Sequence, residues 1–215
     1  VNVSHELKTP LTAIKGFVET MEPRAEAENR PYLEIIRRNT DRLIAVVEDL
    51  LVLSHLEERG MMTDKVSVEV APLAENILRL FGKRAAEKGI ALALDAPAGL
   101  PRLQADPLQI EGLLLNLVDN AVKYTDKGTV GVRLGAADGR FLIEVTDTGL
   151  GIDAPHLPHI FERFYVADKS RSKKLGGTGL GLSIVKPIGL AHQGTVSVKS
   201  RLGEGTTFTV SLPLG

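Results

Sequence analysis

The most informative absences in this 215-residue sequence are those of cysteine, of excess charge and of long apolar runs. Without cysteine the chain can have no disulfide scaffold, no thiolate zinc site and no cysteine nucleophile. Its formal net charge of -1 gives no long-range attraction to nucleic acid or to an anionic membrane surface, so we expect neither as a partner. No apolar run approaches the roughly 18 residues of a membrane span.

Hydrophobic residues make up 43% of the chain, which is enough for a packed core. The length suits a small domain followed by a medium one. The sequence begins with Val1 rather than methionine, and a helical pattern is already under way there. We therefore expect a piece of a longer protein, whose other parts include sensing or membrane segments.

The first 58 residues show the three- and four-residue spacing of apolar side chains that is typical of helices. One apolar stripe covers residues 7–21 and a second covers 36–53, and residues 22–31, with a proline near each end, separate them. The pattern predicts an antiparallel helical hairpin. Because a hairpin this thin cannot bury both stripes alone, we expect two copies to form a four-helix bundle.

After a predicted linker at 59–67, residues 68–215 alternate between helical and strand patterns. The resulting prediction is a mixed sheet with helices packed on one face, so that the whole chain has an α + α/β organisation. Helices are expected over 72–88 and 106–122, and strands over 90–94, 129–134, 141–145, 195–199 and 207–212. Residues 148–178 lack periodicity, and a loop of that length is typical of a functional lid or of a disordered segment.

The segment Ser4-His5-Glu6-Leu7-Lys8-Thr9-Pro10 places reactive side chains on the first helix. At a spacing of four, His5 and Thr9 share a helix face, and Glu6 is adjacent. A neutral imidazole is a competent nucleophile near pH 7, and a neighbouring carboxylate can fix its tautomer. Thr9 is placed to orient a water for the reverse, hydrolytic reaction. Taken alone, a histidine followed by glutamate is usually a solvated surface residue.

A second group of polar residues lies on the predicted helix 106–122 and just beyond it. Asn116 and Asn120 are four apart on one face and offer amide oxygens to a hard cation and its waters. Lys123 follows three residues later as a point charge for a triphosphate. The alternative is an asparagine-rich amphipathic helix without a ligand.

The segment Asp147-Thr-Gly149-Leu-Gly151 directly follows a predicted strand. A carboxylate at this place can accept a hydrogen bond from the exocyclic amine of adenine, and the glycines let the backbone approach a nucleotide. Turns favour the same residues in any case, so the segment alone is weak evidence.

The run Gly177-Thr178-Gly179-Leu180-Gly181 is predicted to open a helix. Backbone N–H groups and the dipole at a helix start can hold phosphates. The run is neither a Walker A motif nor a Gly-x-Gly-x-x-Gly fingerprint.

Together these segments resemble the bacterial sensor histidine kinases, in the family's order and spacing over nearly the whole chain. Residues 4–12 resemble the phosphoacceptor box, and Ile14-Lys-Gly-Phe17 is similar to the phosphate-sensing branch. The resemblance implies a dimerisation and phosphotransfer hairpin at 1–58 and an ATP-binding α/β sandwich of the GHKL or Bergerat type at 68–215. It also implies a homodimer, a response-regulator receiver domain as partner, and a cytoplasmic position within a membrane-anchored sensor.

The resemblance further assigns roles to single residues. His5 would be phosphorylated from ATP with the help of Glu6, and Thr9 would serve a phosphatase reaction towards the regulator. Asn120, with Asn116, would hold Mg²⁺. The other nucleotide contacts that it implies are Lys123, Tyr124, Asp147, Gly149, Gly151, Gly177, Thr178, Gly179, Leu180, Gly181 and Thr206.

One position distinguishes the chain from ATPases of the same fold. Those enzymes carry a glutamate, which acts as general base on water, where this sequence has Asn116. An amide cannot take the proton, so bound ATP is expected to be hydrolysed slowly and to remain intact until it reacts with His5. A general ATPase is therefore the less favoured alternative.

The sequence also departs from the family pattern. Val166 stands where the family has an arginine, and Pro187 and Gly189 are expected to interrupt the helix after the glycine run. These changes keep open a second hypothesis, a degenerate nucleotide-binding module that signals by conformation alone. Retention of His5 and Asp147 favours the kinase.

Four residues of the predicted lid invite further expectations. Phe161 and Phe164 are expected to anchor the lid by packing. His156 and His159 have the spacing of a metal pair, but we do not expect them to hold zinc.

Overall fold

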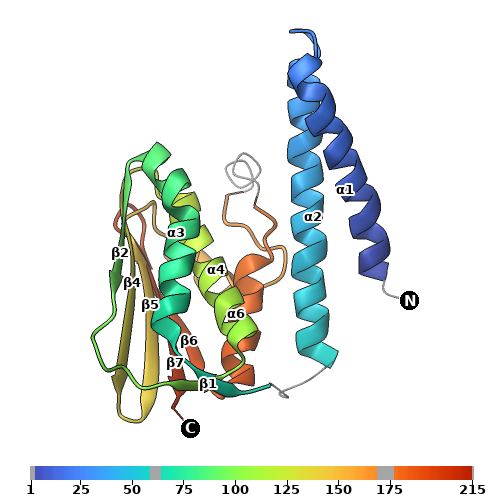
Figure 1. The fold of residues 1–215 in the computed structure, drawn as a ribbon. Coiled ribbons are helices and arrows are strands. Elements are labelled where there is room, and N and C mark those ends of the chain that lie inside the picture. Colours follow the sequence, from blue (N-terminus) through green and yellow to red (C-terminus); the bar gives the residue numbers. More distant parts are fainter. Residues whose placement is uncertain (1–2, 59–63, 169–176, 215) are drawn as a thin grey trace.

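The computed structural model describes residues 3–58, 64–168 and 177–214. Its N-terminal part is a pair of long helices, α1 (Val3–Met21) and α2 (Arg30–Glu58), with the short 3-10 helix η1 (Glu22–Arg24) between them. The predicted hairpin is thereby confirmed (Figure 1). Within the described chain, no helix is both long enough and apolar enough to span a membrane.

The hairpin buries only part of its apolar surface. Val18, Leu33 and Val47 are buried, and Lys15 and Asp41 form an ion pair of 2.7 Å between the two helices. Among the described residues of the hairpin, nine large apolar side chains stay exposed, and we call this set the hairpin stripe. It consists of Ile14, Phe17, Met21, Tyr32, Ile35, Ile36, Leu43, Leu50 and Val52.

The C-terminal part is built on a five-stranded mixed sheet in the order β2-β4-β5-β7-β6. Only β2 and β4 pair in parallel; the other neighbours are antiparallel. The strands are β2 (Ile90–Asp95), β4 (Gly128–Ala137), β5 (Arg140–Asp147), β6 (Thr195–Arg201) and β7 (Gly205–Pro213). A separate pair, β1 (Val66–Val68) with β3 (Leu103–Ala105), was not predicted, and β1 begins inside the expected linker.

Three helices, α3 (Val70–Lys88), α4 (Pro107–Tyr124) and α6 (Gly181–Ala191), pack on one face of the sheet as predicted (Figure 1). Asp106 caps α4, because its carboxylate accepts hydrogen bonds from the N–H groups of Leu108 and Gln109. Leu113, Leu117 and Ile143 are fully buried in the core between α4 and the sheet.

The expected interruption of α6 is wrong, because the helix runs through both Pro187 and Gly189 to Ala191. Its apolar face is held in the core by Ile184 and Ile188, and this packing outweighs the propensities of the two residues. The glycine has a packing role, since a Cβ at Gly189 would lie 2.7 Å from Val196 Cγ2 on β6.

The hairpin is docked on the C-terminal part through α2. Leu53 is 2% exposed and belongs to the same core cluster as the helices of that part, with Val46 and Leu56 packed beside it. A hydrogen bond of 2.9 Å also runs from the Thr178 hydroxyl to the Asp49 carboxylate. Helix α2 thus lies against the start of α6.

Candidate functional site

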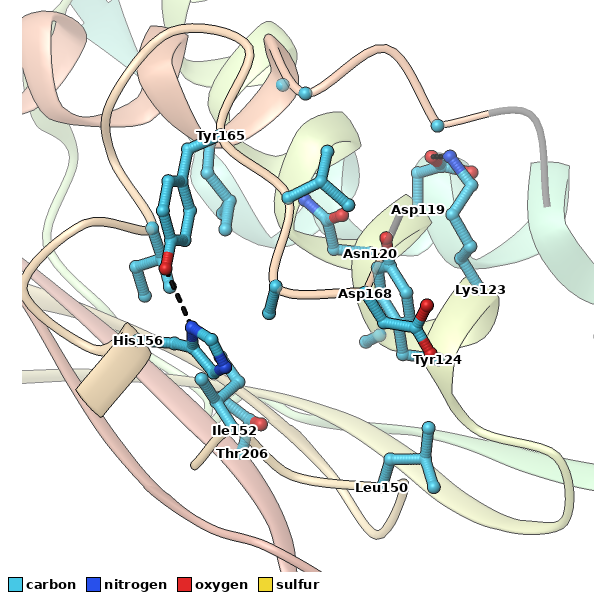
Figure 2. A pocket seen from close by; sticks show the side chains of 18 of the residues that line it. Asp119, Asn120, Lys123, Tyr124, Leu150, Ile152, His156, Tyr165, Asp168 and Thr206 are labelled. Carbon is cyan, nitrogen blue, oxygen red and sulfur yellow. Dashed lines mark hydrogen bonds and ion pairs between the residues drawn. The ribbon is translucent and has the colours of Figure 1, made fainter. Parts of the chain in front are cut away.

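The sequence-predicted residues of the C-terminal part converge on a cavity of about 650 Å³. Its walls come from α4, from the segment after β5, from the start of α6 and from β7. Helix α2 adds Ala45 and Asp49 from the hairpin. Figure 2 shows Asn120 and Lys123 projecting from α4 beside Tyr124, with Thr206 and His156 towards the sheet.

The two asparagines line the cavity with their oxygens available as ligands. Asn116 Nδ2 donates to the Gly112 carbonyl at 2.9 Å, and Asn120 Nδ2 donates to the Asn116 carbonyl at 3.0 Å. A Cβ on Gly181 would lie 2.6 Å from Asn116 Oδ1, so the glycine leaves that oxygen room. Two outward amide oxygens fit the preference of a hard cation for oxygen ligands.

Positive charge in the cavity is supplied by Lys123, whose side chain is only 13% exposed. Its Nζ lies 3.1 Å from Asp119 Oδ2, and Arg84 donates to the other oxygen of Asp119 at 2.8 Å. Asp119 was not predicted as a site residue. It holds Lys123 beside the asparagines, where a polyphosphate would need a cation.

The carboxylate of Asp147 forms the buried end of the cavity. Its Oδ1 accepts the Gly149 N–H at 2.8 Å, and the Thr206 N–H also donates to this carboxylate. Burial raises the pKa of Asp147 to about 6, and the two N–H donors offset only part of that effect. Asp147 is therefore charged at neutral pH but loses its charge in mild acid.

A pH dependence of nucleotide binding follows from this pKa. Because protonated Asp147 accepts more weakly from the adenine amine, ATP affinity should fall about tenfold between pH 7 and pH 5. Binding calorimetry of Asp147→Asn gives the control, since the titration of the ATP phosphates is common to both chains. If both chains show the same pH dependence, Asp147 does not contact the base.

Two glycines of the segment after β5 are needed for close backbone contacts. A Cβ on Gly149 would lie 2.5 Å from the Tyr124 carbonyl, and one on Gly151 would lie 1.9 Å from the Arg201 carbonyl. Between them, the Leu150 N–H donates to the Tyr124 carbonyl at 3.2 Å. Gly151 lines the cavity, whereas Gly149 lies behind the wall and shapes it.

The glycine run lines the opposite side through four predicted residues, Gly177, Thr178, Gly179 and Gly181. The predicted contribution of Leu180 is not seen. Its side chain is fully buried in the core, and its N–H donates to the Thr178 hydroxyl at 3.1 Å. Burial in the core stabilises this apolar side chain, which directly precedes α6, more than contact with a polar ligand would.

The two phenylalanines of the lid behave differently. Phe161 packs edge-on against Phe208, with ring centroids 6.2 Å apart, which agrees with its predicted role. The prediction for Phe164 is wrong, because its side chain is 59% exposed. It contributes through the backbone instead: its φ is 60°, and its N–H donates to the Gly179 carbonyl at 2.8 Å.

His156 and Tyr165 were missed as lining residues. The His156 Nδ1 and the Tyr165 hydroxyl lie 2.7 Å apart in the cavity wall (Figure 2). His159 instead pairs with Glu162 at 2.6 Å. In the part of the chain that the structure covers, no three histidine, cysteine or acidic side chains gather around a common metal position.

Asp49 is the least predictable residue of the site, because it comes from the hairpin. Its carboxylate accepts from Thr178, and burial raises its pKa, with the Thr178 hydroxyl and Lys123 acting in the opposite direction. The Asp49 carboxylate therefore occupies the edge of the cavity where Lys123 and the glycine run meet.

The predicted residues of the phosphoacceptor box lie elsewhere. His5, Glu6 and Thr9 belong to α1, with Thr9 exposed; the side chains of His5 and Glu6 fall outside the described residues. In Figure 1, α2 lies between α1 and the sheet domain. Thr9 does not line the cavity.

Two family models cover the chain in the order of its two parts. Residues 2–59 match the His Kinase A (phospho-acceptor) domain, and residues 105–215 match the histidine kinase-, DNA gyrase B-, and HSP90-like ATPase family. The hairpin therefore coincides with the phospho-acceptor match, and most of the cavity lies in the part that matches the ATPase family. The chain belongs to the sensor histidine kinases, in the branch similar to the phosphate sensors.

Individual proteins agree with this assignment. The phosphate regulon sensor protein PhoR of Pseudomonas aeruginosa is 38% identical over 212 residues, covering 97% of this chain and 48% of PhoR. The sensor protein kinase WalK of Staphylococcus saprophyticus is 36% identical over 218 residues, covering 99% and 35%. The crystal structure of full-length ShkA in complex with AMPPNP superposes with a TM-score of 0.82 at 34% identity, covering 99% of this chain and 45% of ShkA. The chain therefore spans about half or less of these proteins.

Proposed function

We propose that this chain binds Mg²⁺-ATP in the cavity, transfers the γ-phosphoryl group to His5 and passes it on to an aspartate of a response regulator. The observation that carries the proposal is the convergence of Asn120, Lys123 and Asp147, with the glycine run, on one cavity. The match of the N-terminal part to the phosphoacceptor domain supplies the acceptor.

For each part of ATP, the cavity wall offers side chains or backbone groups of suitable chemistry. Asp147, at the buried end, accepts from the adenine amine. Lys123 and the start of α6 face the phosphates, with Thr178 at the edge. The amide oxygens of Asn116 and Asn120 would hold Mg²⁺, which neutralises charge on the phosphate oxygens when bound.

In the transfer, a ring nitrogen of His5 forms a bond to the γ-phosphorus, and the bond from that phosphorus to the β–γ bridging oxygen breaks. ADP leaves, and Glu6 accepts the proton that the other ring nitrogen of the imidazole releases. The protein contributes mostly position and charge. Since α2 lies between α1 and the sheet domain, this domain has to swing along the hairpin to reach His5.

The partners follow from surfaces of the hairpin. A second copy would cover exposed apolar side chains of the hairpin stripe, which gives the four-helix bundle. The receiver domain of the regulator would dock beside His5. Exposed Thr9, four residues after His5 in α1, is suited to orient a water for dephosphorylation of that regulator.

The test is incubation with γ-³²P-ATP and Mg²⁺. The chain should acquire label that is acid-labile and alkali-stable, and His5→Gln should lose it completely. His55→Gln is the matched control, because His55 is an exposed histidine on α2 and should leave labelling unchanged.

ATP binding without labelling would favour the degenerate module. Val166→Arg is then the variant to examine, since Val166 lines the cavity where the family carries an arginine. Label that persists in His5→Gln would place the acceptor elsewhere.

A further inference from the structure

A group of hydroxyls lies beneath the buried end of the cavity. Thr206 on β7 pairs directly with Asp147 on β5, so both side chains lie on the same face of the sheet. Both line the cavity, and Thr206 is only 6% exposed. Behind them, Ser200 on β6 pairs with Thr206 but does not line the cavity.

The hydrogen bonds of Ser200 fix the direction of each proton. Its Oγ accepts the Ile152 N–H at 2.8 Å, donates to the Gly205 carbonyl at 2.8 Å, and lies 2.9 Å from Thr206 Oγ1. A serine hydroxyl has one proton, and here Ser200 directs it at the Gly205 carbonyl, which can only accept a hydrogen bond. The bond between the two hydroxyls therefore needs the proton of Thr206.

With its proton directed at Ser200, Thr206 Oγ1 has only lone pairs left for the cavity. Asp147 beside it is also an acceptor when ionised. The backbone beneath them has little freedom, since a Cβ on Gly205 would lie 2.0 Å from the Asp147 carbonyl. Of the described residues at the buried end of the cavity, Asp147 and Thr206 thus present two acceptors and no hydroxyl donor.

We propose that Ser200 is a positioning residue that sets the polarity of Thr206 and so selects 6-amino purines over 6-oxo purines. The inference rests on the nucleotide binding in the proposed function. A 6-amino group donates to such acceptors, directly or through a water, whereas a 6-oxo group faces acceptor with acceptor. Ser200 acts through Thr206 and does not touch the base.

The test is binding calorimetry of ATP and ITP at pH 8, where Asp147 is ionised. The parent chain should prefer ATP. In Ser200→Ala the Thr206 hydroxyl can turn and donate, so the preference should shrink about fivefold, mainly through tighter ITP binding. Ser200→Thr restores the hydroxyl and should restore the preference. Ser197→Ala is the matched control, an exposed serine on the same strand that should leave the preference unchanged.

A second variant separates this role from general support of the fold. Thr206→Val removes the hydroxyl that Ser200 orients, so adding Ser200→Ala to it should leave the ATP-to-ITP ratio unchanged. The inference would be overturned if Ser200→Ala weakened the binding of ATP and ITP equally, or if the parent chain showed no preference for ATP over ITP. A parent that prefers ATP but is not labelled at His5 would overturn the proposed function alone.

Discussion

Gly151→Ala is expected to weaken ATP binding by at least about a hundredfold, whereas Gly139→Ala should leave it unchanged. Both glycines have positive φ, 67° and 72°, so alanine meets a comparable backbone strain of about 1–2 kcal/mol at each. They differ in their surroundings. A Cβ on Gly151 would lie 1.9 Å from the Arg201 carbonyl oxygen and 2.6 Å from its carbon, while one on Gly139 has no neighbour within 4 Å.

The contact at Gly151 is between backbone segments, so no side chain can rotate away to relieve it. The segment after β5 must move from the turn between β6 and β7, and this carries Leu150 and Ile152 out of the cavity wall. Calorimetric titration with ATP, combined with thermal melting of both variants, measures the effect. Similar affinities in the two variants would show that the wall adapts without loss of the site.

Asp49→Asn is expected to tighten ATP binding about thirtyfold. Two unit charges about 5 Å apart at an effective dielectric constant of about 20 repel by about 3 kcal/mol, and screening reduces this further. Asp49 places such a charge beside Lys123 and Thr178, where the phosphates are proposed to lie. Asparagine keeps an acceptor for the Thr178 hydroxyl and removes only the charge.

Glu48→Gln provides the comparison, because Glu48 is the neighbouring carboxylate on α2 and pairs with Lys8 instead of facing the cavity. Its effect on ATP affinity should be within about twofold, since exposed ion pairs contribute little. Raised salt should reduce the difference in ATP affinity between the parent chain and Asp49→Asn. An unchanged affinity in Asp49→Asn would mean that α2 stands clear of the phosphates when ATP binds.

The elements with regular periodicity could be predicted from the sequence alone. Repeats of three and four residues located α1 and α2, and alternation located β4 to β7, because burial of one face imposes these periods. The short strands β1 and β3 could not be found, since three residues are too few to show a period. The prediction of an interruption at Pro187 was wrong because helix propensity is a local property, whereas the core packing that overrides it depends on residues distant in the sequence.

The candidate site divides in the same way. Asn116, Asn120, Lys123 and Asp147 were found because each sits in a motif whose spacing reflects one helix or one turn. Asp49 was not, since it reaches the cavity only through the docking of α2, and nothing near it in the sequence indicates a ligand. Leu180 was placed in the site by its position in the glycine run, although its side chain points into the core.

The wall that α2 adds to the cavity makes the nucleotide site a joint property of both parts of the chain. Ala45 and Asp49 leave that wall whenever the sheet domain separates from the hairpin. A nucleotide that binds the separated arrangement more tightly must favour separation by the same free energy, because thermodynamic coupling is reciprocal. A rotation of α2 would then change the ATP affinity, and the cellular ATP level would in turn bias the position of α2.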